Sequence, residues 1–167
     1  MPLCCIDDYE VEANRRLLPS AAAYYSSGSC GEETLQLNKQ AFQRLRIRPR
    51  VLRNVVDRDL SVQVLGRKVH VPIGVAAAAM QKMAHPDGEC ANARAVGSVG
   101  SIYQLSTVST CSIEEVAEAA PNTIKWFQLY LLKDRDLSEK LIKRAAKAGF
   151  TAVVLTVDAS TWGVRRA

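Results

Sequence analysis

Polar side chains recur where short apolar runs of this sequence end, and they are the first candidates for chemistry. They are Ser106 and Thr107, Gln128 and Tyr130, and Thr156 and Asp158. Hydroxyl, amide and carboxylate groups can hydrogen-bond a polar ligand, and a buried one without a partner costs about 1 to 3 kcal/mol. Capping of a following helix explains each pair taken alone. Their recurrence at successive run ends favours a binding site.

The apolar run at 73–76 leads instead into small residues, Ala77, Ala78 and Ala79. Small side chains allow a flat ligand to approach the backbone closely. We therefore expect a flat ligand to lie against this loop, with polar groups from the other run ends at its edge.

Parallel strands would bring these run ends together. Helical segments separate the runs, which lie at 73–76, 102–105, 126–130 and 152–157. Each run is apolar on both faces, as expected of parallel strands buried under helices. In such α/β sheets ligands bind at the carboxyl ends of the strands. A capping box at 112–115 and a terminating Gly149 mark the ends of two of the intervening helices.

The first part of the chain predicts helices and a hairpin. The expected helices span 7–18, 20–28 and 32–44. Asp7 or Asp8 is expected to cap the first of them. Valines alternate with other residues on both sides of Gly66, and this pattern predicts a β-hairpin over 62–71.

The composition is that of a soluble globular protein, because 48% of the 167 residues are hydrophobic and 23% are charged. A chain of this length buries one core, so we expect a single domain. The longest apolar stretch, 73–80, is far shorter than the roughly 20 residues of a membrane span, and we expect no membrane partner. A complete (β/α)₈ barrel takes roughly 250 residues, which this length excludes.

The net charge of +5 is concentrated between Arg44 and Arg58, a segment with six arginines and one acidic residue. Over 44–51 the arginines alternate with apolar residues, which predicts a half-buried strand with a solvated basic face. No stacking aromatic residues interleave with these arginines, as single-strand binders require, so we expect no nucleic-acid partner.

The cysteines and histidines do not have the sequence spacing of a zinc site. Five cysteines occur without C-x-x-C spacing, and the two histidines are His70 and His85. We therefore expect no metal site and a reducing compartment, with each cysteine a small, half-buried thiol.

Short sequence blocks in a fixed order carry a family resemblance across essentially the whole chain. The blocks lie at 23–25, 32–35, 49–55, 79–85, 113–119, 126–130 and 156–158. Any one block is weakly specific, whereas their combined order resembles the FMN-dependent 2-hydroxyacid oxidases of the glycolate oxidase type. The resemblance implies a TIM barrel that oxidises an (S)-2-hydroxy acid to a 2-oxo acid, with FMN passing two electrons to O₂ to give hydrogen peroxide.

The resemblance also implies roles for particular residues. Those implied to contact the isoalloxazine ring of FMN are Ala77, Ala78 and Ala79 on its face and Ser106, Gln128 and Thr156 at its polar edge. Tyr24, Tyr130 and Arg165 would hold the substrate, the arginine by pairing with its carboxylate. Asp158 corresponds to the carboxylate that orients the family's catalytic histidine.

The chain departs from the family pattern at two pocket positions. Ala78 stands where the family usually has threonine, a mild change if backbone atoms make the contact. Val108 replaces a bulky aromatic residue, usually tryptophan, at the pocket wall. This second change predicts a larger pocket and longer 2-hydroxy-acid substrates.

The family's Ser-Asn-His-Gly-x-Arg-Gln block, with the catalytic histidine, and its later lysine near the flavin do not occur in these 167 residues. We therefore expect one truncated domain over 1–167, with helices and a hairpin at 1–71 and the first half of a barrel, about four strands, at 72–167. The resemblance then predicts that residues 1–167 alone do not catalyse the reaction.

Partners and location follow from the resemblance as well. It implies a homotetramer for the full-length form and a peroxisomal location, and the lack of a peroxisomal tripeptide in this sequence leaves a cytoplasmic location open. An alternative is a non-catalytic truncated paralogue or isoform that acts by association with other subunits. A homodimeric closed barrel is disfavoured, because two copies of a first half bring no phosphate site.

Overall fold

The structure is a computed structural model that describes residues 3–159, 161 and 163–166. The chain divides into two compact units, which we call unit 1 (Met1–Val56 with Thr161–Ala167) and unit 2 (Asp57–Ser160). Each unit is described by itself. The expectation of a single domain with an internal boundary at 71/72 stays a prediction.

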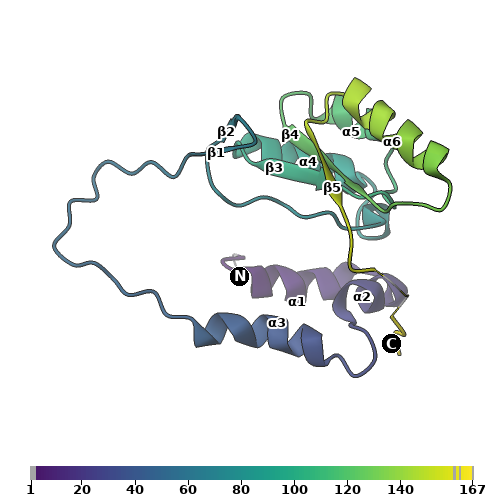
Figure 1. Cartoon of the computed structure of the whole chain (residues 1–167). Helices are drawn as coiled ribbons and strands as arrows, with labels where there is room; N and C mark the ends of the chain where they lie inside the picture. The colour runs from purple at the N-terminus through teal and green to yellow at the C-terminus, as the bar shows by residue number, and fades with distance from the viewer. Residues whose placement is uncertain (1–2, 160, 162, 167) are drawn as a thin grey trace. The chain divides into compact units, whose positions relative to one another are not determined.

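Unit 1 contains three helices, α1 (Ile6–Arg16), α2 (Pro19–Ser26) and α3 (Glu33–Arg44), as Figure 1 shows. Their existence confirms the helices predicted from the sequence. The expected cap of α1 is wrong, because Cys5 is the N-cap and Asp8 lies three positions inside the helix. The Asp8 carboxylate accepts hydrogen bonds from Cys4 N at 2.8 Å and Cys5 N at 3.1 Å, which satisfies donors at the start of the helix.

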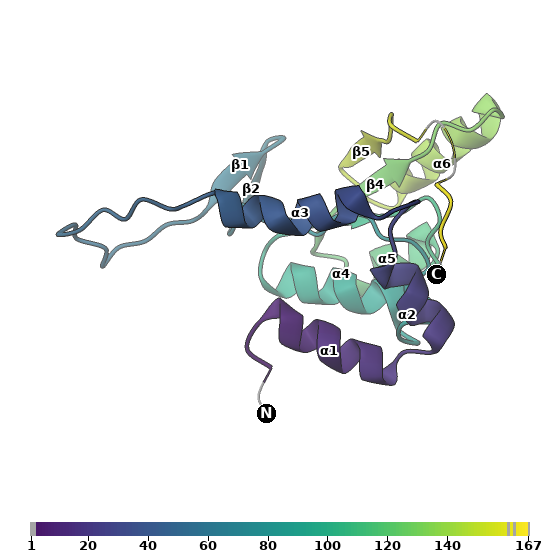
Figure 2. The ribbon, with the colours of Figure 1, turned by 90° about the horizontal axis from the view of Figure 1, so that it is seen from below.

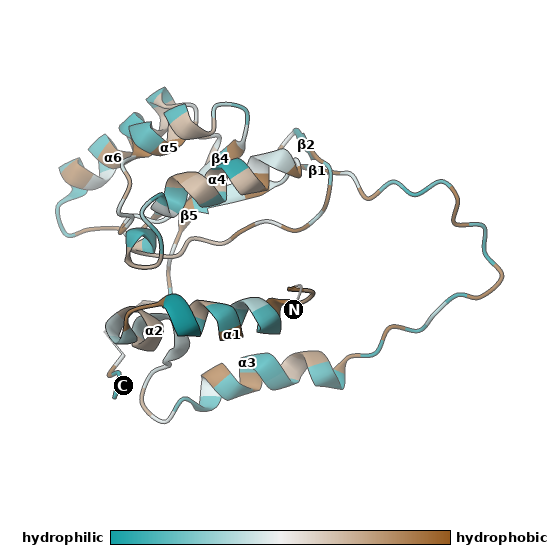
Figure 3. Cartoon of the chain, turned by 180° about the vertical axis from the view of Figure 1, so that it is seen from behind, coloured by the Kyte–Doolittle hydropathy of each residue, from teal (hydrophilic) through white to brown (hydrophobic). Residues whose placement is uncertain are grey.

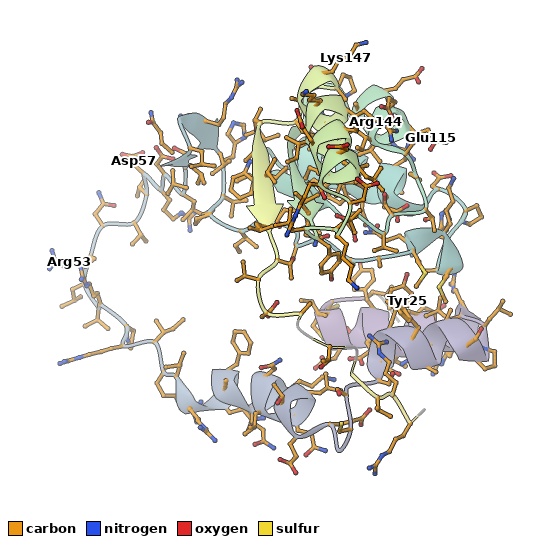
Figure 4. All side chains as sticks on the ribbon, turned by 45° about the vertical axis from the view of Figure 1, so that its right-hand side comes forward. Tyr25, Arg53, Asp57, Glu115, Arg144 and Lys147 are labelled. Atoms are coloured by element: carbon orange, nitrogen blue, oxygen red, sulfur yellow. The ribbon has the colours of Figure 1, made fainter. Side chains whose placement is uncertain are left out.

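Residues 45–61 form an extended segment with no helix or strand, and the strand predicted over 44–51 is therefore wrong (Figures 1 and 3). The apolar side chains of the alternating pattern are exposed, and Ile47 is 96% exposed. Figure 4 shows Arg53 projecting from the same segment. An alternating pattern forms a strand only where another strand supplies hydrogen bonds, and none pairs with this segment among the described residues.

Unit 2 begins with a two-stranded hairpin, β1 (Val62–Val64) and β2 (Arg67–Val69), which confirms the predicted hairpin. The turn residues Leu65 and Gly66 both have positive φ, 47° and 74°. This is the backbone conformation of a two-residue turn whose twist matches the flanking strands.

The main sheet of unit 2 is parallel, in the order β3 (Ile102–Leu105), β4 (Ile124–Leu129) and β5 (Ala152–Leu155). Three of the four predicted strands are thus confirmed. The run at 73–76 is reduced to a single parallel bridge between Val75 and Tyr103, in which Val75 N donates to Ile102 O at 2.9 Å. The exposed Gly74 next to it provides no side chain to pack, and this weakens the run as a strand.

Strands and helices alternate along the chain, so unit 2 has an α/β fold. These helices are η1 (Gln81–Met83), α4 (Gly88–Ser98), α5 (Ile113–Ala119) and α6 (Arg135–Lys147). The predicted capping box is present, since Ser112 N donates to Glu115 Oε2 and Glu115 N donates to Ser112 Oγ. Gly149, with φ of 84°, follows α6 in the conformation that ends a helix, as predicted.

The core lies between the sheet and the helices α4, α5 and α6. Alternate strand residues point into it, namely Tyr103, Leu105, Phe127 and Leu129. They pack against Ala93, Val96, Val116 and Ala145 from the helices. The opposite face of the sheet, with Gln104 and Trp126, is half-exposed among the described residues, so helices cover one face where the sequence predicts cover on both. In the part of the chain that the structure describes, no helix has the length and apolarity to cross a membrane.

Candidate functional site

The carboxyl ends of β3, β4 and β5 carry a hydrogen-bonded polar cluster centred on the buried Gln128. Its side-chain Oε1 accepts from Ser106 Oγ at 3.4 Å and from Thr107 N at 3.0 Å. Its Nε2 donates to Thr156 Oγ1 at 2.9 Å. The structure therefore brings together Ser106, Gln128 and Thr156, the residues that the sequence places at three successive strand ends. We call them, with Thr107, the strand-end cluster.

Backbone geometry fixes the strand-end cluster on the sheet. In the parallel register, Gln128 lies opposite Val154, and Thr156 N donates to Leu129 O at 3.1 Å. Thr107 extends the linkage, because its hydroxyl donates to Gln128 O and accepts from Tyr130 N. The amide of Gln128 thus has both its position and its orientation set by neighbouring strand ends.

The small-residue loop is hydrogen-bonded to the loop after β3, which carries part of this cluster. Met80 N donates to Val108 O at 3.1 Å, which ties the 77–80 loop to the loop after β3. Gln81 Nε2 donates to Ala78 O at 3.0 Å and holds the middle of the loop. Ala78 is exposed, while Ala77 and Ala79 are half-buried. A flat ligand could therefore approach the backbone at Ala78 without meeting a large side chain.

A buried carboxylate, Glu89 in the first turn of α4, holds both loops. Its Oε1 accepts from Gln81 N at 3.0 Å and Thr110 N at 2.8 Å. Its Oε2 accepts from Thr110 Oγ1 at 2.7 Å and Cys111 N at 3.0 Å. Burial by itself raises the pKa of Glu89, but the hydrogen bonds from Thr110 and Gln81 outweigh it and lower the pKa to about 2. Glu89 is therefore ionised at neutral pH.

Tyr103 completes this support beneath the loop. Its buried phenol oxygen accepts from Gln81 Nε2 at 3.3 Å, and burial raises the pKa of Tyr103 well above its ordinary value. Asn92 Nδ2 donates to Gln81 Oε1 at 2.5 Å. Gln81 is consequently fixed by contacts from β3 and α4 and from its own loop.

Sequence reasoning missed Glu89 and the positioning role of Gln81. An acidic residue in the first turn of a helix is normally an exposed partner of the helix dipole, so the sequence around Glu89 does not indicate burial. The one available signal was the polar stretch 106–112, whose many backbone and hydroxyl donors require acceptors once the loop is buried.

Two of the predicted substrate residues, Tyr24 and Arg165, meet within unit 1. The guanidinium carbon of Arg165 lies 4.7 Å from the centroid of the Tyr24 ring. Arg165 Nη1 also donates to Tyr24 O at 2.6 Å. A cation over an aromatic face with a backbone hydrogen bond is a well-fixed positive group, suited to pairing with a carboxylate.

The other predicted residues, Tyr130 and Asp158, belong to unit 2. Tyr130 directly follows β4 and is 39% exposed, and Asp158 follows β5 and is exposed. Val108 is also exposed, in the loop after β3. The roles predicted for these three residues stay predictions. Within the described ranges, no group of three or more His, Cys, Asp and Glu side chains is arranged to hold a metal ion.

A small-residue loop and a hydrogen-bonded cluster at the carboxyl ends of parallel strands define an α/β protein with a ligand site at its strand ends. Comparison with known families identifies the family within this class. The model of the FMN-dependent dehydrogenase family matches residues 13–167, and the chain belongs to this family. The resemblance stated from the sequence is thereby confirmed, and the family supports FMN as the cofactor.

Curated relatives match over nearly all of this chain. It is 50% identical over 163 residues to 2-hydroxyacid oxidase 1 of Homo sapiens. This match covers 98% of this chain and 44% of the relative. It is 49% identical over 160 residues to glycolate oxidase 1 of Zea mays, with 96% and 43% covered. The chain thus spans less than half the length of these relatives.

Solved structures show the same fold over the same extent. The flavin-binding domain of baker's yeast flavocytochrome b2 matches with a TM-score of 0.94 and 38% identity, covering 98% of this chain and 43% of that one. A mandelate oxidase variant with (S)-mandelic acid matches with a TM-score of 0.93 and 35% identity, covering 98% and 48%.

Proposed function

We propose that unit 2 forms the first half of a (β/α)₈ barrel and supplies one wall of an FMN site in an enzyme that oxidises 2-hydroxy acids. The observation that carries this proposal is the strand-end cluster, in which Gln128 links Ser106, Thr107 and Thr156 at three neighbouring strand ends. Family membership and the names of the relatives support the cofactor and the substrate class.

The chemistry of the cluster fits the polar edge of an isoalloxazine ring. That edge carries carbonyl and imide groups, which need both donors and acceptors. The Thr156 hydroxyl accepts from Gln128 and keeps its own proton for a further acceptor, and a carboxamide offers two donors and one acceptor. The exposed, small Ala78 next to the cluster suits the face of a flat ring.

FMN, when bound, supplies the two-electron redox chemistry of 2-hydroxy-acid oxidation. The residues described here bind and orient it. Gln128 and its hydroxyl partners would fix the ring edge, while Gln81 and Glu89 hold the loop that packs against the ring face. Positioning of this kind lowers the entropic cost of reaction, because the reacting groups are already aligned.

The Tyr24–Arg165 pair is the candidate for binding the substrate carboxylate. The fixed guanidinium provides charge and paired N–H donors, and the aromatic ring limits its movement. Tyr130 would add a phenol donor, and Asp158 would orient a catalytic histidine supplied outside this sequence. Val108 in place of a bulky aromatic residue supports substrates longer than glycolate.

Association with other chains is the second candidate function, in keeping with a non-catalytic form. β5 exposes Val153 by 44% and Leu155 by 48%, and its outer edge pairs with no strand among the described residues. An unpaired edge with apolar side chains is a place where further strands add. In a complete barrel this edge would accept the next strand, and in a separate short chain it would accept one from another subunit.

The proposed function is tested by joining residues 1–167 to the remaining sequence of human 2-hydroxyacid oxidase 1. We expect this fusion to purify with bound flavin and to produce hydrogen peroxide from a 2-hydroxy acid, and residues 1–167 alone to produce none. A folded fusion without flavin would contradict the proposed FMN site. Peroxide production by residues 1–167 alone would contradict the proposed division of the catalytic machinery.

The second candidate is tested by adding residues 1–167 to the full-length human relative and measuring the mass of the assembly by light scattering. Association predicts mixed assemblies that disappear when Leu155 is replaced by Lys. Full-length assemblies of unchanged mass would rule it out for this partner.

A further inference from the structure

Two cysteine side chains line one pocket on the helix-covered side of unit 2, and its lining includes no residue of the strand-end cluster. The pocket has a volume of about 360 Å³ and is lined by Cys90 and Cys111 together with charged side chains. Cys90 comes from the first turn of α4, and Cys111 lies just before α5. These two helices run side by side in Figure 2.

One carbonyl oxygen brings the two cysteines together. Asp87 O accepts from Cys90 N at 3.1 Å at the start of α4, and the Cys111 thiol lies 3.9 Å from the same oxygen. The Cys111 thiol also contributes to raising the pKa of Cys90, as expected of neighbouring groups that line one pocket. Both thiols therefore line the same pocket beside the Asp87 carbonyl, which accepts from the Cys111 thiol.

The two thiols differ in access and in mobility. Cys111 is 2% exposed, and its backbone is tied by the hydrogen bond from Cys111 N to Glu89 Oε2 at 3.0 Å. Cys90 is half-buried and lines the same pocket. A small oxidant would therefore meet Cys90 first, with Cys111 held behind it.

We propose that Cys90 and Cys111 are a modification site that forms an intramolecular disulfide when a hydroperoxide enters this pocket. In the first step the sulfur of Cys90, having lost its proton, attacks one peroxide oxygen. The O–O bond breaks, hydroxide leaves and takes up a proton, and a sulfenic acid forms. In the second step the sulfur of Cys111 attacks the Cys90 sulfur, the S–S bond forms, and the sulfenic oxygen leaves as water. One hydroperoxide is reduced and two thiols are oxidised.

The charges around the pocket set the speed of the first step. Burial and the Cys111 thiol raise the pKa of Cys90 to about 11, and Glu115 acts in the same direction, while Arg94 opposes them. Lys82, Asp87 and Glu118 complete the charged lining. Because the thiolate reacts, the rate is expected to rise about tenfold per pH unit at pH values below this pKa. The site is a slow one that responds to sustained exposure.

The disulfide would connect α4 directly to the loop after β3. That loop already depends on Glu89 for its anchoring, and the new bond would add a covalent constraint beside it. Closing a loop of about twenty residues restricts the unfolded chain, so we expect the melting temperature of the folded protein to rise by several degrees. This inference does not rest on the proposed oxidase function, because the oxidant can be supplied from outside.

The unmodified chain provides the first test. Residues 1–167 are treated with hydrogen peroxide at pH 8.5, alkylated and digested, and the peptides are identified by mass spectrometry. We expect a cross-linked peptide that joins Cys90 to Cys111. The exposed Cys4, Cys5 and Cys30 also meet the oxidant, so only this peptide is diagnostic. Oxidation of Cys90 to a sulfinic acid with Cys111 still free would overturn the proposal.

Matched variants provide the second test. Cys30→Ser removes an exposed thiol of unit 1 and is expected to leave the cross-link and the rise in melting temperature unchanged. Cys90→Ser is expected to abolish both while Cys111 stays reduced. If the melting temperature of Cys90→Ser rises on oxidation as much as that of the unmodified chain, the proposed pairing is wrong. Chain unfolded in guanidinium before oxidation serves as the reference for random pairing.

Discussion

Gln128 and Glu89 are both buried polar side chains of unit 2, yet their hydrogen bonds are completed in different ways. Both carboxylate oxygens of Glu89 accept two hydrogen bonds each, from Gln81, Thr110 and Cys111, so the protein itself saturates the group. The carboxamide of Gln128 has a single described partner, Thr156, for the two protons of its Nε2. The first group builds the fold, and the second retains capacity for a ligand.

This difference separates stability from binding at two buried polar groups of the same unit. A saturated buried charge contributes to folding and offers nothing to a ligand, because its lone pairs are used. A carboxamide whose neighbours are hydroxyl groups can exchange partners at low cost when a ligand arrives. Loss of Glu89 should therefore change stability first, whereas loss of Gln128 should change flavin binding first.

The largest effect is expected from Glu89→Ala. The substitution removes the acceptor of Gln81 N, Thr110 N and Cys111 N, and an unsatisfied buried donor costs about 1 to 3 kcal/mol, so we expect a loss of about 3 kcal/mol or more. Urea unfolding followed by circular dichroism measures it. Glu118→Ala, an exposed acidic residue of α5, is the control and should change stability by less than about 0.5 kcal/mol. Equal losses for both variants would contradict the structural role of Glu89.

The pH dependence of stability sharpens the same point. The pKa of Glu89 falls from 4.5 to about 2 on folding, which corresponds to about 3 kcal/mol. Because the folded pKa is the lower one, this contribution is present above pH 4.5 and is lost as the pH falls toward 2. The difference in unfolding free energy between the unmodified chain and Glu89→Gln, measured from pH 7 to pH 3, should shrink with falling pH. A difference that stays constant would refute the linkage.

A smaller loss of stability is expected from Gln128→Leu. Thr107 N and the Ser106 and Thr156 hydroxyls lose a partner, but they lie at the strand ends where water can replace it, so we expect a loss of about 1 kcal/mol. The same unfolding measurement applies. A loss as large as that of Glu89→Ala would show that the two clusters do not differ as described.

The smallest effect is expected from Arg144→Ala. Arg144 of α6, labelled in Figure 4, donates from Nε and Nη2 to the carboxylate of Glu114 on α5 at 3.1 and 2.8 Å. About half of each side chain is exposed. Exposed ion pairs contribute about 0.2 to 1 kcal/mol, and salt screens them. Urea unfolding in low and high salt should show a loss in this range that diminishes with salt. A salt-independent loss would indicate packing rather than charge.

The sequence predicted the elements of unit 2 well, because their signals are local. The hairpin at Gly66, the capping box at Ser112 and the strand ends at Ser106, Gln128 and Thr156 were all placed correctly. Each depends on a few neighbouring residues or on the side-chain period of a strand. The convergence of the strand ends follows from parallel pairing alone.

What the sequence did not predict depends on partners distant in the chain. The arginines of 44–51 alternate as in a strand, but no strand among the described residues pairs with them. Glu89 resembles a surface acid until the loop at 106–112 folds over it, and its acceptors are saturated by residues up to 22 positions away. The meeting of Cys90 and Cys111 is likewise a consequence of how α4 and α5 pack.

We infer that Gln128 positions flavin and does not mainly support the fold. The most direct measurement is the flavin dissociation constant of the fusion with the human relative, carrying either Gln128→Leu or Gln104→Leu, a half-buried glutamine of β3 outside the strand-end cluster. We predict that Gln128→Leu weakens flavin binding about tenfold or more, as expected for about 1.4 kcal/mol, and that Gln104→Leu changes it less than about twofold. Equal affinities for the two folded variants would contradict the account.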